Sequence, residues 1–118
     1  MPKPVQEIQP TEVDCADATL ARAMVQWLSH LRAERRLSPK TLEAYARDLR
    51  QCLAFLAEHW GKQVTLKAFA SAEASDIRAF MAMRRADDIA GRSLMRALAG
   101  LRSFGRFLER EGLSLIHI

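Results

Sequence analysis

Hydrophobic positions in the first half of the chain recur every three or four residues, which is the period of an amphipathic α-helix. Between residues 17 and 36 they form one stripe: Leu20, Met24, Trp27, Leu28 and Leu31. Between residues 39 and 59 they form a second: Leu42, Tyr45, Leu49, Cys52, Leu53 and Leu56. Ser38 suits the N-cap of the second helix, Pro39 suits its first position, and Gly61 follows its end. The pattern predicts two long helices joined by a short turn.

The second half of the chain keeps the helical period. Residues 62–74 predict a loop with one helical turn near residues 66–69. A third helix is expected over residues 75–86, with an apolar face of Ile77, Phe80 and Met81. A fourth is expected over residues 93–110, with an apolar stripe of Leu94, Leu98, Leu101, Gly105 and Leu108. No segment alternates in the two-residue period of a strand. We therefore expect an all-α fold, a compact bundle of four main helices.

The two ends of the chain differ from its middle. Residues 1–16 contain three Pro and no helical period, and they predict a flexible leader. Residues 17–112 then form one helical domain, which the length of 118 residues allows. We interpret residues 113–118 (LSLIHI) as a short tail that results from a truncation or comes from a vector.

Charge is divided unevenly along the chain. Residues 1–18 carry a net charge of −3, so the other residues carry +7 of the overall +4. A basic body behind an acidic leader suits a domain that binds a polyanion. Solvated helix faces with a bias towards arginine would give the same balance, so charge alone does not separate the two interpretations.

The basic residues of the predicted fourth helix are more informative. On a wheel at 100° per residue, five positions fall within about 80° of each other, opposite the apolar stripe. They are Arg92, Arg96, Ser103, Arg106 and Arg110. A surface helix usually mixes the two signs of charge, whereas this face has no acid between its arginines. The face favours contact with nucleic acid over simple solvation.

The start of the second helix offers a second anionic contact. Lys40 and Thr41 lie in its first turn, beside backbone N–H groups that the helix leaves free, which makes a ready site for phosphate. The alternative is a well-capped core helix. The cluster of Arg32, Arg35 and Arg36 near the end of the first helix suits the helix dipole, with a phosphate contact as its alternative.

Catalytic and metal-binding patterns are absent from the sequence. The three His and two Cys lack the spacing of a metal or redox site, and Tyr45 lies on an apolar stripe, as a core residue would. We expect no catalytic residues, no cofactor, no metal and no small-molecule substrate. No apolar run approaches the ~20 residues that span a bilayer, and no signal peptide is recognisable, so a cytoplasmic protein without a membrane partner is expected.

The helical segments resemble those of the tyrosine recombinases of the Xer and phage-integrase type. Residues 37–56 read LSPKTLEAYARDLRQCLAFL, similar to the family's opening segment LS…T…Y..DL..F..FL. Residues 93–112 read SLMRALAGLRSFGRFLEREG, similar to S..R.LS.LR.F..FL...G. The segments MVQWLSHLRAERRLS and DIRAFMAMRR also match in type and order, so the resemblance spans about residues 19–113 and is closest to the chromosome-dimer-resolving Xer branch.

This resemblance implies a SAM-like core-binding domain whose second and fourth helices meet the major groove and its phosphates. The matching positions are Lys40, Thr41, Arg47, Ser93, Arg96, Arg102 and Ser103. Together with Arg92 and Arg106 from the wheel, they are the candidate DNA-binding residues. Arg102 is the exception on the wheel, where it lies about 80° from the centre of the basic face. We expect Arg96→Ala to weaken DNA binding and leave the fold intact.

The resemblance also implies partners and a missing domain. Full-length family members carry a second domain with an Arg–Lys–His-x-x-Arg–His/Trp set and a Tyr nucleophile, which these residues do not contain, so this chain is not expected to cleave DNA alone. The implied partners are double-stranded DNA and other recombinase protomers, in a tetrameric synapse of the parent protein. The alternatives are a non-recombinase DNA-binding regulator and a helical protein-interaction module that uses Trp27 and Met24 of the first helix.

Overall fold

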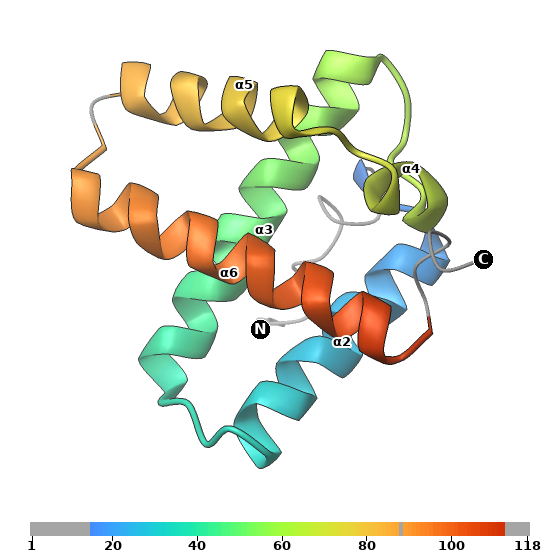
Figure 1. Cartoon of the computed structure of the whole chain (residues 1–118), viewed down its shortest axis with the longest axis vertical. Helices are drawn as coiled ribbons and strands as arrows, with labels where there is room; N and C mark the ends of the chain where they lie inside the picture. The colour runs from blue at the N-terminus through green and yellow to red at the C-terminus, as the bar shows by residue number, and fades with distance from the viewer. Residues whose placement is uncertain (1–14, 88, 113–118) are drawn as a thin grey trace, which may run out of the picture.

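The protein is an all-α domain, as the hydrophobic pattern predicts (Figure 1). A computed structural model describes residues 15–87 and 89–112. Their helices are α2 (Ala18–Ala33), α3 (Pro39–Trp60), α4 (Leu66–Ala70), α5 (Ala74–Ala86) and α6 (Gly91–Arg110). The short helix α4 confirms the turn expected near residues 66–69, and each of the four main helices matches a predicted one.

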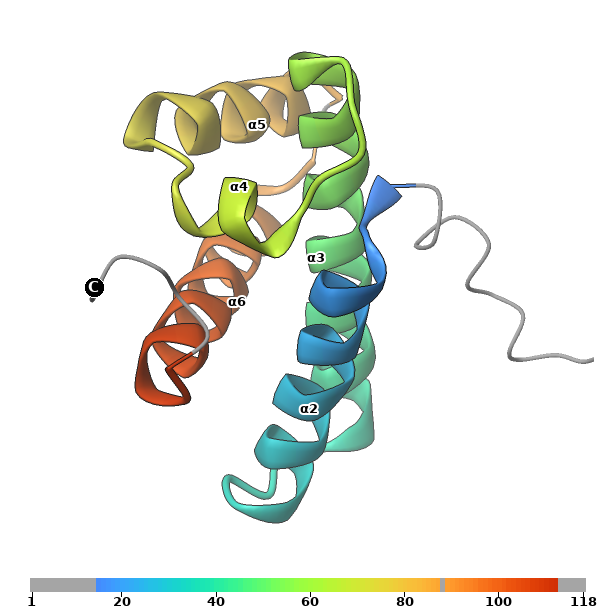
Figure 2. The ribbon, with the colours of Figure 1, turned by 90° about the vertical axis from the view of Figure 1, so that its right-hand side faces the viewer.

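The long helix α3 is the centre of the arrangement and packs against α2, α5 and α6. Helix α2 runs alongside it, joined to it by a short turn at one end (Figure 2). Helix α6 crosses α3 near its middle, and α5 crosses its other end (Figure 1). The two helices with candidate DNA-binding residues, α3 and α6, therefore cross in direct contact.

Aromatic side chains join these helices in one core. Trp27 of α2 is fully buried, and its ring stacks on Tyr45 of α3 at 6.0 Å between centroids. Phe104 of α6 tilts against Trp27 at 5.1 Å and against Phe69 of α4 at 5.4 Å. The expectation that Trp27 and Met24 could contact a partner protein is wrong, because Met24 is also buried in this core.

The helix ends follow the capping residues closely. Asp17 accepts a hydrogen bond from the Leu20 N–H at 2.9 Å, so α2 begins one residue later than predicted. Helix α2 also ends at Ala33 rather than residue 36, and Arg36 has the left-handed φ of 54°. Helix α3 starts as predicted, since Ser38 Oγ accepts from the Thr41 N–H at 3.2 Å. Helices α5 and α6 begin one and two residues earlier than expected.

The beginning of the described chain belongs to the domain, which corrects the predicted leader boundary. Ala16 is 1% exposed and forms an isolated parallel bridge with Val64. The Val64 N–H donates to the Cys15 carbonyl at 2.7 Å, and the Asp17 N–H donates to the Val64 carbonyl at 2.9 Å. The predicted leader of residues 1–16 therefore extends at least two residues too far. Its residues 1–14, and the predicted tail of residues 113–118, lie outside the described residues.

Candidate nucleic-acid interface

The buried face of α6 differs from the one read off its leucines. Its buried residues are Leu94, Ala97, Gly100, Leu101, Phe104, Phe107 and Leu108. Leu98 and Gly105 of the predicted stripe are only half-buried. At 100° per residue, the centre of the buried face lies about 70° from the predicted one. The solvent face of α6 turns by the same angle, and this changes which candidates can meet DNA.

Arginines dominate the solvent face of α6. Arg92, Arg102 and Arg106 are exposed, together with Arg110 near the helix end. Arg102, the exception on the wheel, now lies close to the middle of this face. Within residues 15–87 and 89–112, no acidic side chain forms an ion pair with Arg92, Arg102 or Arg106. Their guanidinium groups are therefore available to a polyanion.

Arg96 has a different environment, because it forms an ion pair with Asp48 of α3. Its Nε donates to Asp48 Oδ2 at 2.9 Å and its Nη2 donates to Oδ1 at 3.1 Å. The Asp48 carboxylate is 2% exposed, whereas the Arg96 side chain is 32% exposed. The hydrogen bonds that Arg96 donates to Asp48 raise the pKa of Arg96, against the lowering effect of burial. Arg96 thus holds α6 against α3 at the point where the two helices cross.

This ion pair corrects the expectation that Arg96→Ala leaves the fold intact. Without the guanidinium, a buried carboxylate would have no partner, which is costly in a low-dielectric interior. Asp48 was not among the candidate residues. The signal for it is an acidic residue on the flank of an otherwise apolar helix face, in the YARDL segment.

Ser103 also has a structural contact. It is half-buried, and its Oγ accepts a hydrogen bond from Trp27 Nε1 at 3.1 Å. The buried indole N–H needs such an acceptor, so Ser103 helps fix the aromatic core. Arg96 and Ser103, which the wheel placed within the basic face, therefore lie at its edge, beside α3 and α2.

The candidates on α3 lie in its first half. Lys40 is exposed in the first turn, and Arg47 is exposed two turns later, next to Asp48. Thr41 is half-buried, and its Oγ1 accepts from Ser38 Oγ at 3.0 Å. Ser93, in the first turn of α6, is half-buried as well. The Arg96–Asp48 ion pair links the first half of α3 to the first half of α6, the two segments that carry these candidates.

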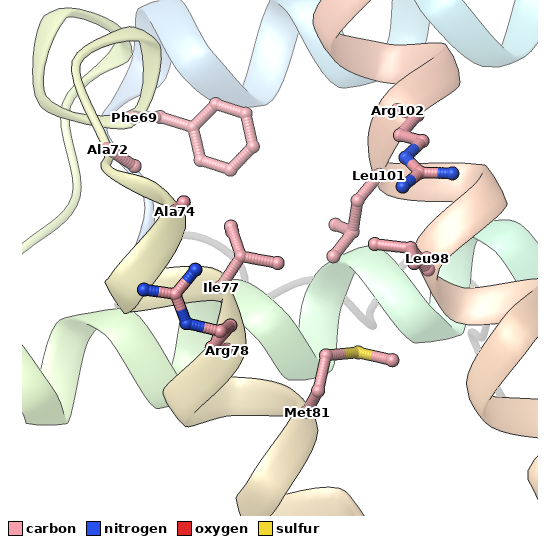
Figure 3. Close-up of a pocket in the computed structure, with 9 residues that line it drawn as sticks. All are labelled: Phe69, Ala72, Ala74, Ile77, Arg78, Met81, Leu98, Leu101 and Arg102. Atoms are coloured by element: carbon pink, nitrogen blue, oxygen red, sulfur yellow. The ribbon is translucent and has the colours of Figure 1, made fainter.

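An apolar groove lies between α5 and α6 (Figure 3). Its volume is about 460 Å³, and Ile77 and Met81 of α5 face Leu98 and Leu101 of α6 across it. Arg78 and Arg102 stand at its two walls, and none of its lining residues carries a carboxylate, thiol, hydroxyl or imidazole. The groove offers no acid, base or nucleophile for a reaction.

The described residues show no metal site and no membrane span. Among them, no three His, Cys, Asp or Glu side chains are grouped to hold a metal ion. None of their helices is sufficiently long and apolar to cross a bilayer. Cys52 is fully buried, and burial raises the pKa of its thiol to about 12, so it stays protonated at neutral pH.

A helical domain with an exposed arginine face, built on two crossing helices, is the class that the fold and this surface define. The chain belongs to the phage integrase N-terminal SAM-like domain family, whose model matches residues 24–112. This confirms the resemblance to tyrosine recombinases that the two motif segments indicate.

Within that family, the chain is similar to several proteins named tyrosine recombinase XerC. The chain is 78% identical over 101 residues to the tyrosine recombinase XerC of Bradyrhizobium diazoefficiens, covering 86% of this chain and 32% of that protein. It is 70% identical over 102 residues to the tyrosine recombinase XerC of Nitrobacter winogradskyi, covering 86% and 32%. For that of Brucella suis the identity is 48% over 98 residues, covering 83% and 31%. The chain thus spans about a third of the length of these relatives. No solved structure matches it.

Proposed function

We propose that this chain is the DNA-binding domain of a site-specific tyrosine recombinase of the XerC kind, and that it grips one recombination half-site through α3 and α6. The exposed arginine face of α6 carries this proposal, because Arg92, Arg102 and Arg106 have no acidic partner among the described residues. The relatives named as tyrosine recombinases support the same class of partner, double-stranded DNA.

The candidate residues divide into two roles in this proposal. Lys40, Arg47, Arg92, Arg102 and Arg106 are exposed cations that contact phosphates and supply most of the affinity. Arg96 orients α6 on α3 and keeps its remaining N–H groups for a phosphate. Thr41, Ser93 and Ser103 are half-buried at the edge of the surface, where a hydroxyl can donate to a phosphate from a fixed position.

The parent protein would carry the chemistry outside this chain. Because the XerC relatives are about three times as long, we propose that the residues that cleave and rejoin DNA belong to the remaining length. The chain would then bind without cutting, in the cytoplasm, and without a cofactor. Protomers of the parent would assemble as a tetramer on DNA. Light scattering of the chain without DNA should show a monomer, and a stable dimer would favour a protein-interaction module instead.

The test is fluorescence anisotropy of a labelled duplex of roughly 30 base pairs, titrated with the chain at several salt concentrations. With about four to six phosphates neutralised, log K should fall with log salt at a slope of roughly −4 to −5. Arg92→Ala, Arg102→Ala and Arg106→Ala should each make the slope shallower by about 1. A slope shallower than about −2 for the unchanged chain would mean that the arginine face does not bind phosphate.

Arg22→Ala is the matched control for these variants. Arg22 is exposed on α2, outside the arginine face of α6. Its replacement by alanine removes the same charge from the protein as each of the other three substitutions. Arg22→Ala should lower the affinity for DNA only slightly, and it should change the slope of log K against log salt by much less than 1. Equal losses for Arg22→Ala and Arg102→Ala would indicate attraction by net charge rather than a defined surface.

A further inference from the structure

Met95 is an exposed hydrophobic side chain in the middle of α6. It is 62% exposed, and Val25 of α2, at 64%, is the other large hydrophobic side chain exposed among the described residues. A single exposed apolar side chain is ordinary on a protein surface and needs no explanation by itself. Met95 is distinguished by its neighbours, because it interrupts a face that otherwise carries arginines.

Most exposed residues of α6 lie on one stripe along the helix, and the exposed Glu109 and Arg110 follow it at the helix end. Five of them follow at intervals of three and four residues: Arg92, Met95, Ala99, Arg102 and Arg106. Such intervals keep side chains on one face of a helix, here over a length of about 21 Å. The stripe is cationic at both ends, and Met95 and Ala99 make its inner part apolar. The apolar part of the stripe therefore lies between two cationic parts of the same helix face.

The major groove of DNA offers one apolar group to such a stripe. The groove is about 12 Å wide, and phosphates border it on both sides, within reach of arginines at the two ends of the stripe. Between the phosphates, base edges display hydrogen-bond donors and acceptors, and thymine alone displays a methyl group, at C5. A thioether side chain and an alanine donate no strong hydrogen bond, so they cannot read guanine or adenine edges as Arg or Asn does. Met is also flexible enough to close around a methyl group.

We propose that Met95, with Ala99 one turn further along α6, contacts the C5-methyl group of a thymine and so selects a T·A pair at one position of the half-site. This inference rests on the proposed function, since it requires α6 to lie in the major groove. It assigns base selection to two residues that the candidate list does not contain. The arginines on either side then set the depth and direction of the helix in the groove.

The experiment begins with a selection from a random-sequence duplex library by the chain, followed by substitution of 2′-deoxyuridine for each thymine of the recovered site. Deoxyuridine keeps the pairing and removes only the methyl group. At one position the deoxyuridine duplex should bind about fourfold more weakly. This factor corresponds to ~0.8 kcal/mol for burying one methyl or methylene group, since 1.4 kcal/mol changes the dissociation constant tenfold. Met95→Ala should bind the thymine and deoxyuridine duplexes equally, at the weaker of the two affinities.

Val25→Ala is the matched control, because Val25 is as exposed as Met95 and lies on α2. It should keep the fourfold difference between the two duplexes. Circular dichroism should show that both variants fold, since neither side chain is buried.

The outcomes separate this inference from the proposed function. Salt-dependent binding with no thymine sensitive to deoxyuridine, or an unchanged sensitivity in Met95→Ala, would overturn the contact and leave the DNA-binding function standing. Absence of salt-dependent binding to any duplex would overturn both. A methyl effect that is lost in Met95→Ala and kept in Val25→Ala would establish the contact.

Discussion

At the scale of single residues, the ion pair between Asp48 and Arg96 makes a partly exposed arginine part of the fold. The Arg96 guanidinium forms two hydrogen bonds with a carboxylate that is 2% exposed, from a helix 48 positions away in the chain. Arg96 belongs both to the crossing of α3 and α6 and to the proposed DNA surface. A loss of DNA binding in an Arg96 variant can therefore arise from the fold as well as from a lost contact.

We expect Arg96→Ala to lower the free energy of unfolding by roughly 3 kcal/mol, because it leaves the Asp48 carboxylate buried without a partner. Chemical denaturation measures this change directly. Adding Asp48→Ala to Arg96→Ala should recover more than half of the lost stability, because it removes the unpaired charge.

Arg106→Ala provides the control, since Arg106 is exposed on the same helix without an ion pair to a described residue. Its free energy of unfolding should stay within about 0.5 kcal/mol of the unchanged chain. If Arg96→Ala were equally neutral, the ion pair would contribute nothing to stability, and only a DNA contact would remain as a role for Arg96.

At the scale of elements, α6 shows why a helix can be predicted correctly while its orientation is not. The leucines alone suggest one buried face, whereas Phe104 and Phe107 are larger, and their burial decides which face of α6 packs on α2 and α3. Gly100 allows the close approach of α6 to α3. A Cβ placed on it would lie 3.2 Å from Tyr45 Cδ1, so α6 crosses α3 with the glycine directly over the tyrosine ring.

Two glycines of α6 give a matched pair of predictions. Gly100→Ala should destabilise the protein by about 1 kcal/mol, because Tyr45 is stacked on Trp27 and cannot yield without disturbing the core. Gly105→Ala should stabilise it by about 0.5–1 kcal/mol, because nothing lies within 4 Å of the added carbon and alanine is the better helix former.

Thermal unfolding followed by circular dichroism compares the two variants under the same conditions. Tyr45→Leu should relieve the cost of Gly100→Ala in the double variant, because a smaller side chain leaves room for the added carbon. Stabilisation by Gly100→Ala to the same extent as by Gly105→Ala would contradict the close crossing of α6 and α3.

At the scale of the whole molecule, the domain combines an aromatic core with a basic surface on one pair of helices. The core residues Trp27, Tyr45 and Phe104 come from three helices, and the exposed cations of the proposed surface belong to two of these, α3 and α6. Binding of DNA to this surface should stabilise the fold, since a ligand that binds only the native state shifts the unfolding equilibrium.

With duplex DNA at about ten times its dissociation constant, stability should rise by roughly 1.4 kcal/mol, a shift in Tm of about 6 °C for a domain of this size. Differential scanning fluorimetry at low and high salt would show it. The shift should vanish at high salt and in a variant with Arg92, Arg102 and Arg106 all changed to alanine. That variant should melt normally without DNA, and a shift that persists in it would place the DNA surface elsewhere.

The sequence by itself determined the all-α class, the number of main helices, most of their ends and the family. These features depend on neighbours a few residues apart: the helical period of apolar positions, the Ser38 cap and the turn at Gly61. It also marked Lys40 and the arginines of α6 as cations that a polyanion could use. The motif segments carried the family resemblance for the same reason, because they are contiguous in the chain.

Only the tertiary structure decided which of those residues are free and which belong to the fold. Arg96 is paired with Asp48, 48 residues away, and Ser103 accepts from Trp27, 76 residues away. Packing of Phe104 in the core turns α6 so that Arg102 and Met95 face solvent. No local pattern encodes such contacts, because they depend on how helices cross and on which side chains fill the space between them.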